Sequence, residues 1–351
     1  MSVEKELDQS LLVEVAMSKR HMEMTLRVAP NSAETALTVN RDRDSPPPSY
    51  YVEEISKLTF EHLQLNVNIY FSAVNYFWRY WQISERNANA RMNDSKKMMN
   101  ILTACVWLAS KMNGTMGTIA TVAFDPEHYL EGYHNNNFTN PPELHEIVTY
   151  MTSGRTRKIN RRHLLQAERE LCQMLEFKFY VVTPRYFLEQ YFQVQKRQLD
   201  VNVATSTGTR QEKKRTLALA EYLCELSLLE RTMHQFKPSM IAASCICHAR
   251  RTYLVSVWPK ILSKHTGYSQ QELAPCELAL LRLSSEAYVR RSGFTYHKYK
   301  SSCYSKVSIL KPYDNEEAKR GKIILSSMSL QDLQDLQDSS TCSSEARTVL
   351  E

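Results

Sequence analysis

The feature that most constrains this fold is a series of helix start and stop signals between Leu217 and Leu283. Pro238 opens an apolar segment, and Pro259 and Gly267 bracket the next one. Proline is favoured in the first turn of a helix, and glycine just beyond its end. The tetrapeptide Ser-Gln-Gln-Glu at 269–272 has the form of a capping box ahead of a further apolar stripe. These signals predict four consecutive helices.

Glycine is scarce throughout the chain, with 8 glycines among 351 residues. Such a composition favours helix bundles over sheets joined by tight turns, so we expect an all-α protein. The length allows two domains with sizeable cores. No catalytic triad, phosphate-binding loop or metal cluster lies among the predicted helices. We therefore expect a protein that works by binding another protein, with no catalytic residues, cofactor or metal of its own.

The charge and the apolar patterns argue against other classes of protein. The formal net charge is +6, but 38 acidic residues make the surface mixed, so nucleic acid is not an expected partner. No apolar run approaches the roughly 18 residues of a membrane span, and the N-terminus lacks a secretory apolar segment. The cysteines fall mostly inside apolar helical patterns, which indicates reduced thiols in an intracellular protein. Cys245 and Cys247 point about 200° apart on a helix, so they cannot share one metal ion.

The chain divides into four parts. Residues 1–48 form a flexible N-terminal tail that ends in a proline run, and residues 314–351 form a polar tail that we expect to be disordered. Between them lie two helical blocks, 49–182 and 183–313. Their similar size and helix count suggest a duplicated bundle, although no strict repeat is visible. The segment near 195–215 is rich in Ser, Thr and charge, and it is predicted to be a loop or linker.

About five helices are predicted in the first block. One spans roughly Tyr51 to Leu65, and a second runs from about Asn68 to Trp81. Asp94 can cap a third helix, and a short fourth helix follows Pro142. Asn160 can cap the fifth, because a short polar side chain at that position accepts hydrogen bonds from the first backbone N–H groups.

Two charges lie on the apolar faces of these helices. Lys111 follows Leu108 by three residues, and Glu168 lies four residues after Leu164 and three before Leu171. A charge held against apolar surface costs several kcal/mol unless it is paired. Periodicity alone favours side chains at the edge of the stripe whose ends reach water. The alternative is that both charges converge at the rim of the first bundle and receive backbone groups of a partner, a hot spot of roughly 2–4 kcal/mol.

A run of segments resembles the cyclin family, specifically its mitotic A/B group. In the second block the matching segments are AEYLCELSLLE, PSMIAAS, WPKILSKHTGYSQQELAPC and KYKSSCYSKVSILKP. In the first block they are FSAVNYFWRYW, TACVWLASK, PPELHEIV and AERELCQMLEF. These segments occur in the family's order and spacing, and the resemblance covers about residues 50–313.

The resemblance implies two tandem five-helix cyclin boxes with flexible termini, the N-terminal box at 49–182 and the C-terminal box at 183–313. It implies a regulatory subunit, not an enzyme, that activates a cyclin-dependent Ser/Thr protein kinase in cell-cycle control, in the nucleus and cytoplasm. The kinase catalytic subunit is the expected partner, with substrate proteins as a second class of partner. Lys111 and Glu168 match the family's kinase-binding residues, so the resemblance reverses the preference from periodicity.

Three departures from the family pattern lie in the first block. The family has an Asp, paired with an Arg of the first helix, where this chain has Trp78. The first-helix motif with that Arg and a substrate-docking patch is not recognisable in PSYYVEEISKL, which puts docking through it in doubt. An insertion at about 114–140 follows Lys111 directly. It could be a solvated loop, or it could add or block kinase contacts.

Two rival functions stay open on the sequence alone. The basic run from Arg155 to Arg162 motivates a cyclin-fold adaptor in transcription or nucleic-acid binding. The departures in the first block motivate a scaffold that has lost kinase activation. A kinase assay with and without the chain separates these functions from activation, and binding to duplex DNA that weakens steeply with salt would favour the adaptor.

Overall fold

The computed structural model describes residues 47–86, 94–120, 141–152, 160–201, 210–253 and 257–312. Side chains are described for these ranges except at 114–120, 149–152, 195–201 and 210–212. Every regular element in them is helical, as predicted. Residues up to Leu310 form one compact unit, and Lys311–Glu351 form a second, of which only two residues are described. The predicted tails lie almost entirely outside the described residues, as do 121–140 of the insertion and 155–159 of the basic run.

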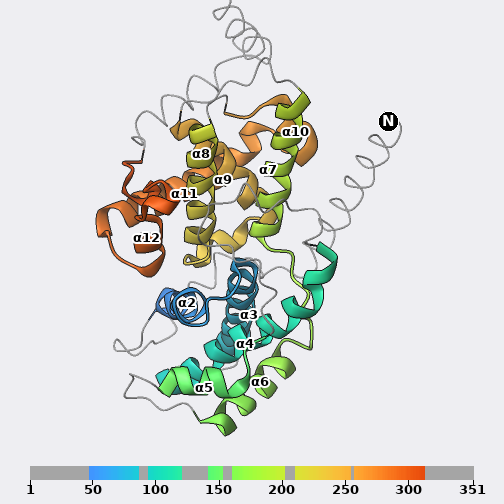
Figure 1. Ribbon diagram of the computed structural model, residues 1–351, viewed down its shortest axis with the longest axis vertical. Coiled ribbons are helices and arrows are strands. Elements are labelled where there is room, and N and C mark those ends of the chain that lie inside the picture. Colours follow the sequence, from blue (N-terminus) through green and yellow to red (C-terminus); the bar gives the residue numbers. More distant parts are fainter. Residues whose placement is uncertain are drawn as a thin grey trace, which may run out of the picture. The chain divides into compact units, whose positions relative to one another are not determined.

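The first bundle surrounds α4 (Ser95–Ala120), which packs against α2, α3 and α6 (Figure 1). Its apolar positions Met98, Ile101, Cys105 and Leu108, at 3-4-3 spacing, are all buried, which makes α4 the core helix of this bundle. The other elements of the bundle are α2 (Pro48–Lys57), the π-helical turn η2 (Leu58–His62), α3 (Val67–Arg86), α5 (Leu144–Thr152) and α6 (Arg161–Met174).

Side-chain caps begin two of these helices at the predicted positions. The Asp94 carboxylate accepts hydrogen bonds from the backbone N–H groups of Lys96 at 2.9 Å and Lys97 at 3.2 Å. The Asn160 side chain accepts from the Arg162 backbone N–H at 3.0 Å. Each bond satisfies N–H groups that have no partner within the helix. Both predicted starts are therefore confirmed.

The second bundle surrounds α9 (Pro238–Thr252), which packs against α7, α8 and α11. Its segment from Ile241 to Ala249 is buried throughout, so the predicted central helix is confirmed. Gly267 adopts φ 68° at the end of α10, and the capping box at Ser269 is formed. The other elements are α7 (Pro184–Val201), α8 (Arg210–Ser227), η4 (Arg231–Gln235), α10 (Lys260–Thr266), α11 (Gln270–Arg290), α12 (Phe294–Tyr299), η5 (Ser302–Tyr304) and η6 (Val307–Ile309).

Two predicted loops are partly helical. The linker predicted near 195–215 is wrong at both ends, because α7 continues to Val201 and α8 already starts at Arg210. Lys, Arg, Gln, Glu and Leu are good helix formers, so a polar composition did not mean a loop here. The insertion predicted at about 114–140 likewise begins inside a helix, since α4 runs on to Ala120. Gly114 and Gly117, which lie within this part of α4, do not stop the helix. None of the described helices is long and apolar enough to span a membrane.

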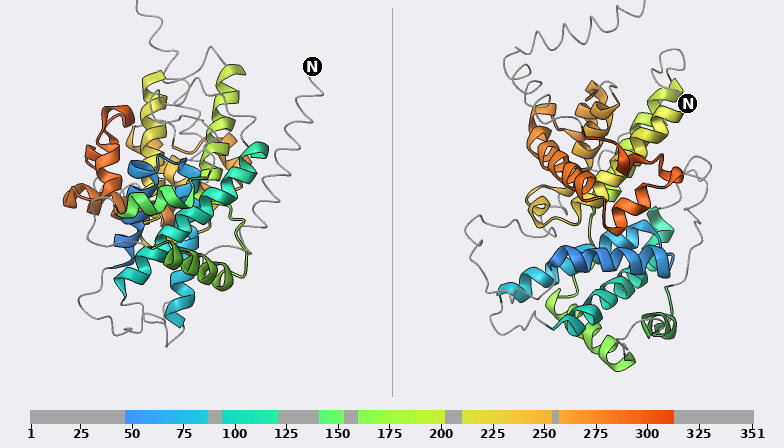
Figure 2. Two further views of the ribbon diagram at one scale, coloured as in Figure 1. Left: turned by 60° about the horizontal axis from the view of Figure 1, so that its bottom comes forward. Right: turned by 90° about the vertical axis from the view of Figure 1, so that its left-hand side faces the viewer.

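The segment after α11 returns from the second bundle to the first. α12 contacts both α2 and α8, and the two bundles lie against each other in two further views (Figure 2). The Glu53 carboxylate of α2 accepts a hydrogen bond from the Phe294 backbone N–H at 2.6 Å. A carboxylate at a helix N-terminus satisfies unpaired N–H groups and complements the helix dipole. α2 of the first bundle therefore caps a helix of the second.

Replacement of Gly293 by alanine is expected to lower the free energy of unfolding by about 1–3 kcal/mol, because its backbone is open essentially to glycine alone. Gly293 has φ 96° and ψ 151°, and a Cβ there would lie 2.8 Å from Glu53 Oε1. A shift of this carboxylate would disturb its hydrogen bond to the Phe294 backbone N–H. Urea unfolding measures the loss, with Ser292→Ala as the control at an exposed neighbour. Equal midpoints for both variants would contradict it.

Candidate functional site

Lys111 of α4 and Glu168 of α6 form an ion pair, joined from Nζ to Oε1. The lysine side chain is 35% exposed and that of the glutamate 18%, so the pair lies at the rim of the first bundle and not in its core. The expected convergence of these two charges is therefore confirmed. Each satisfies the other against the apolar surface, which removes the cost of an unpaired charge.

Trp107 lies directly beneath this pair and was not singled out from the sequence. The Lys111 ammonium is 3.3 Å from the centroid of the indole ring. The ring is 8% exposed, and its Nε1–H donates to the carbonyl oxygen of Pro142 at 3.2 Å. The available signal was the spacing, because residues four apart share one face of a helix. Pro142, 35 residues on, could not be linked to this ring by local spacing.

A second ion pair joins the same two helices. The Lys97 ammonium of α4 lies 2.8 Å from Glu170 Oε1 of α6, and the Tyr80 hydroxyl of α3 donates to the same oxygen at 2.8 Å. Burial, followed by Glu170, raises the pKa of Tyr80 well above its usual value, so the hydroxyl stays a donor. Among the described side chains, two ion pairs therefore join α4 to α6, and the Lys97–Glu170 pair can serve as a control for the Lys111–Glu168 pair.

The chain leaves α6 through an exposed turn that displays an aromatic side chain. Glu176 and Phe177 have φ values of 52° and 56°, in the left-handed region that non-glycine residues rarely adopt. The Phe177 side chain is 69% exposed. Two consecutive residues in this region cost about 1–3 kcal/mol each and persist only where the surroundings hold them. An exposed ring thus follows the helix that carries Glu168.

Helix α3 holds this turn in place. Arg79 donates through a guanidinium nitrogen to the carbonyl oxygen of Lys178 at 2.7 Å. The Tyr76 hydroxyl donates to the carbonyl oxygen of Phe179 at 2.6 Å, and burial raises the pKa of Tyr76. The two bonds anchor the backbone on the C-terminal side of Phe177 to the first bundle. They account for the left-handed turn.

Trp78, at the position where the family pattern has an acid, joins the two bundles. It is 1% exposed, and its Nε1–H donates to the carbonyl oxygen of Leu228, just after α8, at 3.0 Å. Its ring meets the His234 ring edge-on at 5.0 Å between centroids. Burial, then the charge of Arg231, lowers the pKa of His234 to about 3, so that ring is neutral at physiological pH. The position holds an aromatic bridge and no buried acid.

The first helix offers little of an apolar docking patch. Tyr51, Val52 and Ile55 of α2 are buried in the core, and Tyr50 is the exposed ring beside them. Side chains packed in the core are not available to a partner. The packing of α2 therefore agrees with the doubt, raised by the sequence, that substrates dock through this helix.

The Cys-Ile-Cys-His segment of α9 belongs to the core. The Cys247 thiol faces Glu277 Oε2 at 3.5 Å, and burial raises the pKa of Cys245. Burial lowers the pKa of His248 to about 4. Among the described residues, no group of His, Cys, Asp and Glu side chains could hold a metal ion.

Two similar bundles, each built round one buried helix, define a tandem-repeat helical protein. A family model described as the N-terminal domain of cyclins matches residues 55–180, and one described as the C-terminal domain of cyclins matches residues 182–313. The chain belongs to the cyclin family.

Individual relatives agree with this membership. Human cyclin-A1 is 36% identical over 173 residues, 49% of this chain and 33% of the relative. A putative cyclin-B3-1 of Arabidopsis thaliana is 29% identical over 174 residues, 49% of this chain and 39% of the relative. The chain thus matches only a third to two fifths of these relatives' lengths. A viral cyclin from herpesvirus saimiri superposes with a TM-score of 0.50 at 14% identity, over 79% of this chain and all of the other, which shows the fold.

Proposed function

We propose that this chain is a regulatory subunit that binds and activates a cyclin-dependent Ser/Thr protein kinase in cell-cycle control, in the nucleus and cytoplasm. The two boxes would be residues 49–182 and 183–313. Family membership and the similarity to cyclins A and B support the proposal. The observation that carries it is the rim-exposed Lys111–Glu168 pair, at the positions where the family resemblance expects kinase-binding residues. The chain itself would do no chemistry.

The mechanism would be a population shift in the kinase. Protein kinases are active only when a helix that carries a catalytic glutamate swings inward and pairs with the ATP-positioning lysine. A partner that binds this inward state better than the outward state raises its population. The Lys111 ammonium can donate to backbone carbonyls at the end of such a helix, and the Glu168 carboxylate can accept from backbone N–H groups. The exposed Phe177 ring, in the turn that follows the helix of Glu168, would add apolar contact with the kinase.

The test is a charge swap, Lys111→Glu together with Glu168→Lys. The swap keeps an ion pair across α4 and α6, so the fold should survive, but each partner-facing charge is inverted. A desolvated charge contact at the centre of an interface is a hot spot of about 2–4 kcal/mol, so kinase affinity should fall roughly 30- to 1,000-fold. Affinity is measured by titration of the purified kinase, and activation by phosphate transfer to a peptide.

The matched control is the same swap at the neighbouring pair, Lys97→Glu with Glu170→Lys, which should leave affinity within a few-fold of the wild type. If the Lys111/Glu168 swap variant binds the kinase as tightly as the wild type does, these two residues do not contact the kinase.

An adaptor without kinase activation is the second candidate function. Arg161 and Arg162 are exposed at the start of α6, which leaves a basic surface for an acidic partner. Kinase that binds the chain and stays inactive would favour a scaffold. Duplex DNA bound with an affinity that falls steeply as salt rises would favour a nucleic-acid adaptor.

A further inference from the structure

We infer that Trp107 is a positioning residue that holds the Lys111 ammonium in place for its partner. The inference rests on the proposed kinase contact and names the part of this chain that prepares it. Trp107 itself is almost fully buried, so it acts through Lys111 and not by touching the kinase.

The geometry constrains the ammonium from two directions. The indole ring lies on one side, 3.3 Å from Nζ to its centroid, and the Glu168 carboxylate pairs with Nζ from the neighbouring helix. The π face of tryptophan carries negative electrostatic potential and attracts a cation more strongly than the other aromatic rings do. A lysine has a flexible four-carbon stem, so two attractive surfaces are needed to keep its charge at one point.

The indole is itself fixed. Its N–H donates to the Pro142 carbonyl at 3.2 Å, just ahead of α5, and neighbouring core residues bury the ring. Trp107 therefore links the segment just ahead of α5 to the charge at the candidate kinase site. The ring face serves Lys111 and the ring N–H serves Pro142, so substitution can separate the two roles.

Positioning has a measurable consequence for affinity. An ordered side chain has already lost the rotamer freedom that a partner would otherwise have to remove on binding. On the usual scale for one immobilised side chain, the loss of Trp107 should weaken kinase binding by about 2- to 13-fold. This is smaller than the effect of the charge swap, since Lys111 stays present.

The first experiment needs no partner. In the full chain labelled with ¹³C-lysine, the ε-methylene signal of Lys111 should lie upfield of the other lysines, because its protons sit over an aromatic ring. Lys111→Met identifies the signal by its loss. Trp107→Leu should remove the upfield shift, and Trp107→Phe should keep part of it. The Lys97 signal, from the other α4–α6 ion pair, should not move. A Lys111 signal at the ordinary lysine position in the wild type would overturn the inference.

The second experiment is a double-mutant cycle on kinase affinity. Trp107→Leu should weaken binding in the wild type but have no further effect in a Lys111→Met background. Equal weakening in both backgrounds would show a role in packing alone and overturn the inference. If the wild type binds no kinase, the proposed function fails, while the upfield signal still reports whether Trp107 positions Lys111. Thermal unfolding of each variant verifies folding, and Trp107→Phe replaces Trp107→Leu if the latter does not fold.

Discussion

Replacement of Trp78 by alanine is expected to lower the free energy of unfolding by about 3–5 kcal/mol, the cost of emptying a buried aromatic site. Trp78 is among the largest fully buried side chains, and its ring packs beside those of Phe77 and His234. Alanine would also leave the Leu228 carbonyl without its indole donor across the junction of the two bundles. A buried carbonyl without a partner costs about 1–3 kcal/mol, which places this variant towards the upper end of the range.

Urea unfolding of the full chain measures this loss, and two further variants divide it. Trp78→Phe keeps most of the ring and removes the hydrogen bond to Leu228, so it should cost about 1–3 kcal/mol. Trp78→Asp restores the acid of the family pattern without its first-helix partner, which leaves a carboxylate buried and unpaired. It should destabilise at least as much as alanine. An alanine variant within about 0.5 kcal/mol of the wild type would contradict the role of Trp78 as a bridge.

The sequence correctly predicted the features that depend only on neighbouring residues, namely helix caps and the helix face on which a side chain lies. The Asp94 and Asn160 caps are formed because a cap needs only its own side chain and the next few backbone N–H groups. Lys111 and Glu168 were placed on apolar faces by spacing alone, and helix packing then brought them together. The two residues are 57 positions apart in the sequence. The sequence predicted that they converge at one rim of the bundle, but not that they pair with each other.

The remaining features depend on contacts that spacing cannot show. Trp78 could be read only as a missing acid, because its hydrogen-bond partner lies 150 residues away. Pro142 reaches Trp107 across the insertion. The error at 195–215 had another cause, since charge and polarity were taken as signs of a loop although the residue types there favour helix. The sequence analysis thus missed contacts between segments that are distant in the chain. It also misassigned a segment whose polar composition suggested a loop although its residue types favour helix.

The substitution Lys298→Met is expected to lower the free energy of unfolding by about 3–5 kcal/mol, because it strands the Glu225 carboxylate in the interior. The two side chains are 8% and 2% exposed, and Nζ lies 2.6 Å from Glu225 Oε1. The Tyr299 hydroxyl donates to the same oxygen at 2.8 Å. Lys298 also stacks on the Phe60 ring of the first bundle, 3.7 Å from Nζ to the centroid. One ammonium therefore joins α12 to both α8 and the first bundle.

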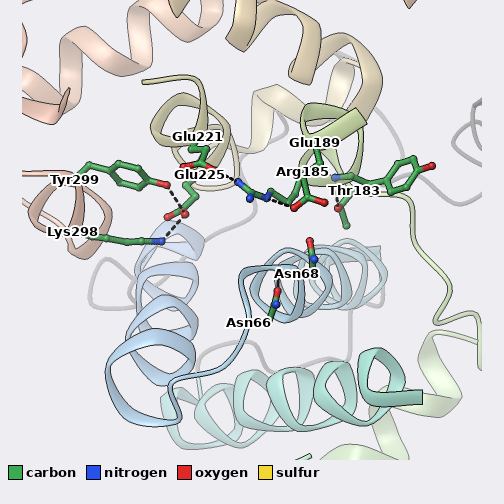
Figure 3. A network of polar contacts seen from close by, with 10 residues as sticks. Asn66, Asn68, Thr183, Arg185, Glu189, Glu221, Glu225, Lys298 and Tyr299 are labelled. Atoms are coloured by element: carbon green, nitrogen blue, oxygen red, sulfur yellow. Dashed lines mark hydrogen bonds and ion pairs between the residues drawn. The ribbon is translucent and has the colours of Figure 1, made fainter. Parts of the chain in front are cut away.

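The charged residues next to Glu225 decide whether another cation can replace Lys298. Figure 3 shows Glu221 and Glu225 on α8, with Arg185 between Glu221 and Glu189. The Arg185 guanidinium donates to Glu221 Oε1 at 2.6 Å and to Glu189 Oε1 at 2.8 Å. Two cations thus serve three carboxylates, so the loss of Lys298 cannot be compensated by Arg185, which already pairs twice.

Pairing and burial can be separated by a second substitution. Lys298→Met combined with Glu225→Leu removes both charges, and its stability should recover most of the loss, since a buried ion pair is often worth no more than apolar packing. Lys300→Met, at an exposed lysine just after α12, is the matched control and should stay within about 0.5 kcal/mol of the wild type. If the double variant is as unstable as Lys298→Met, the loss of stability comes from the lost stacking on Phe60 and the lost packing, and not from the unpaired Glu225 carboxylate. A single variant as stable as the control would show that Glu225 does not need this cation.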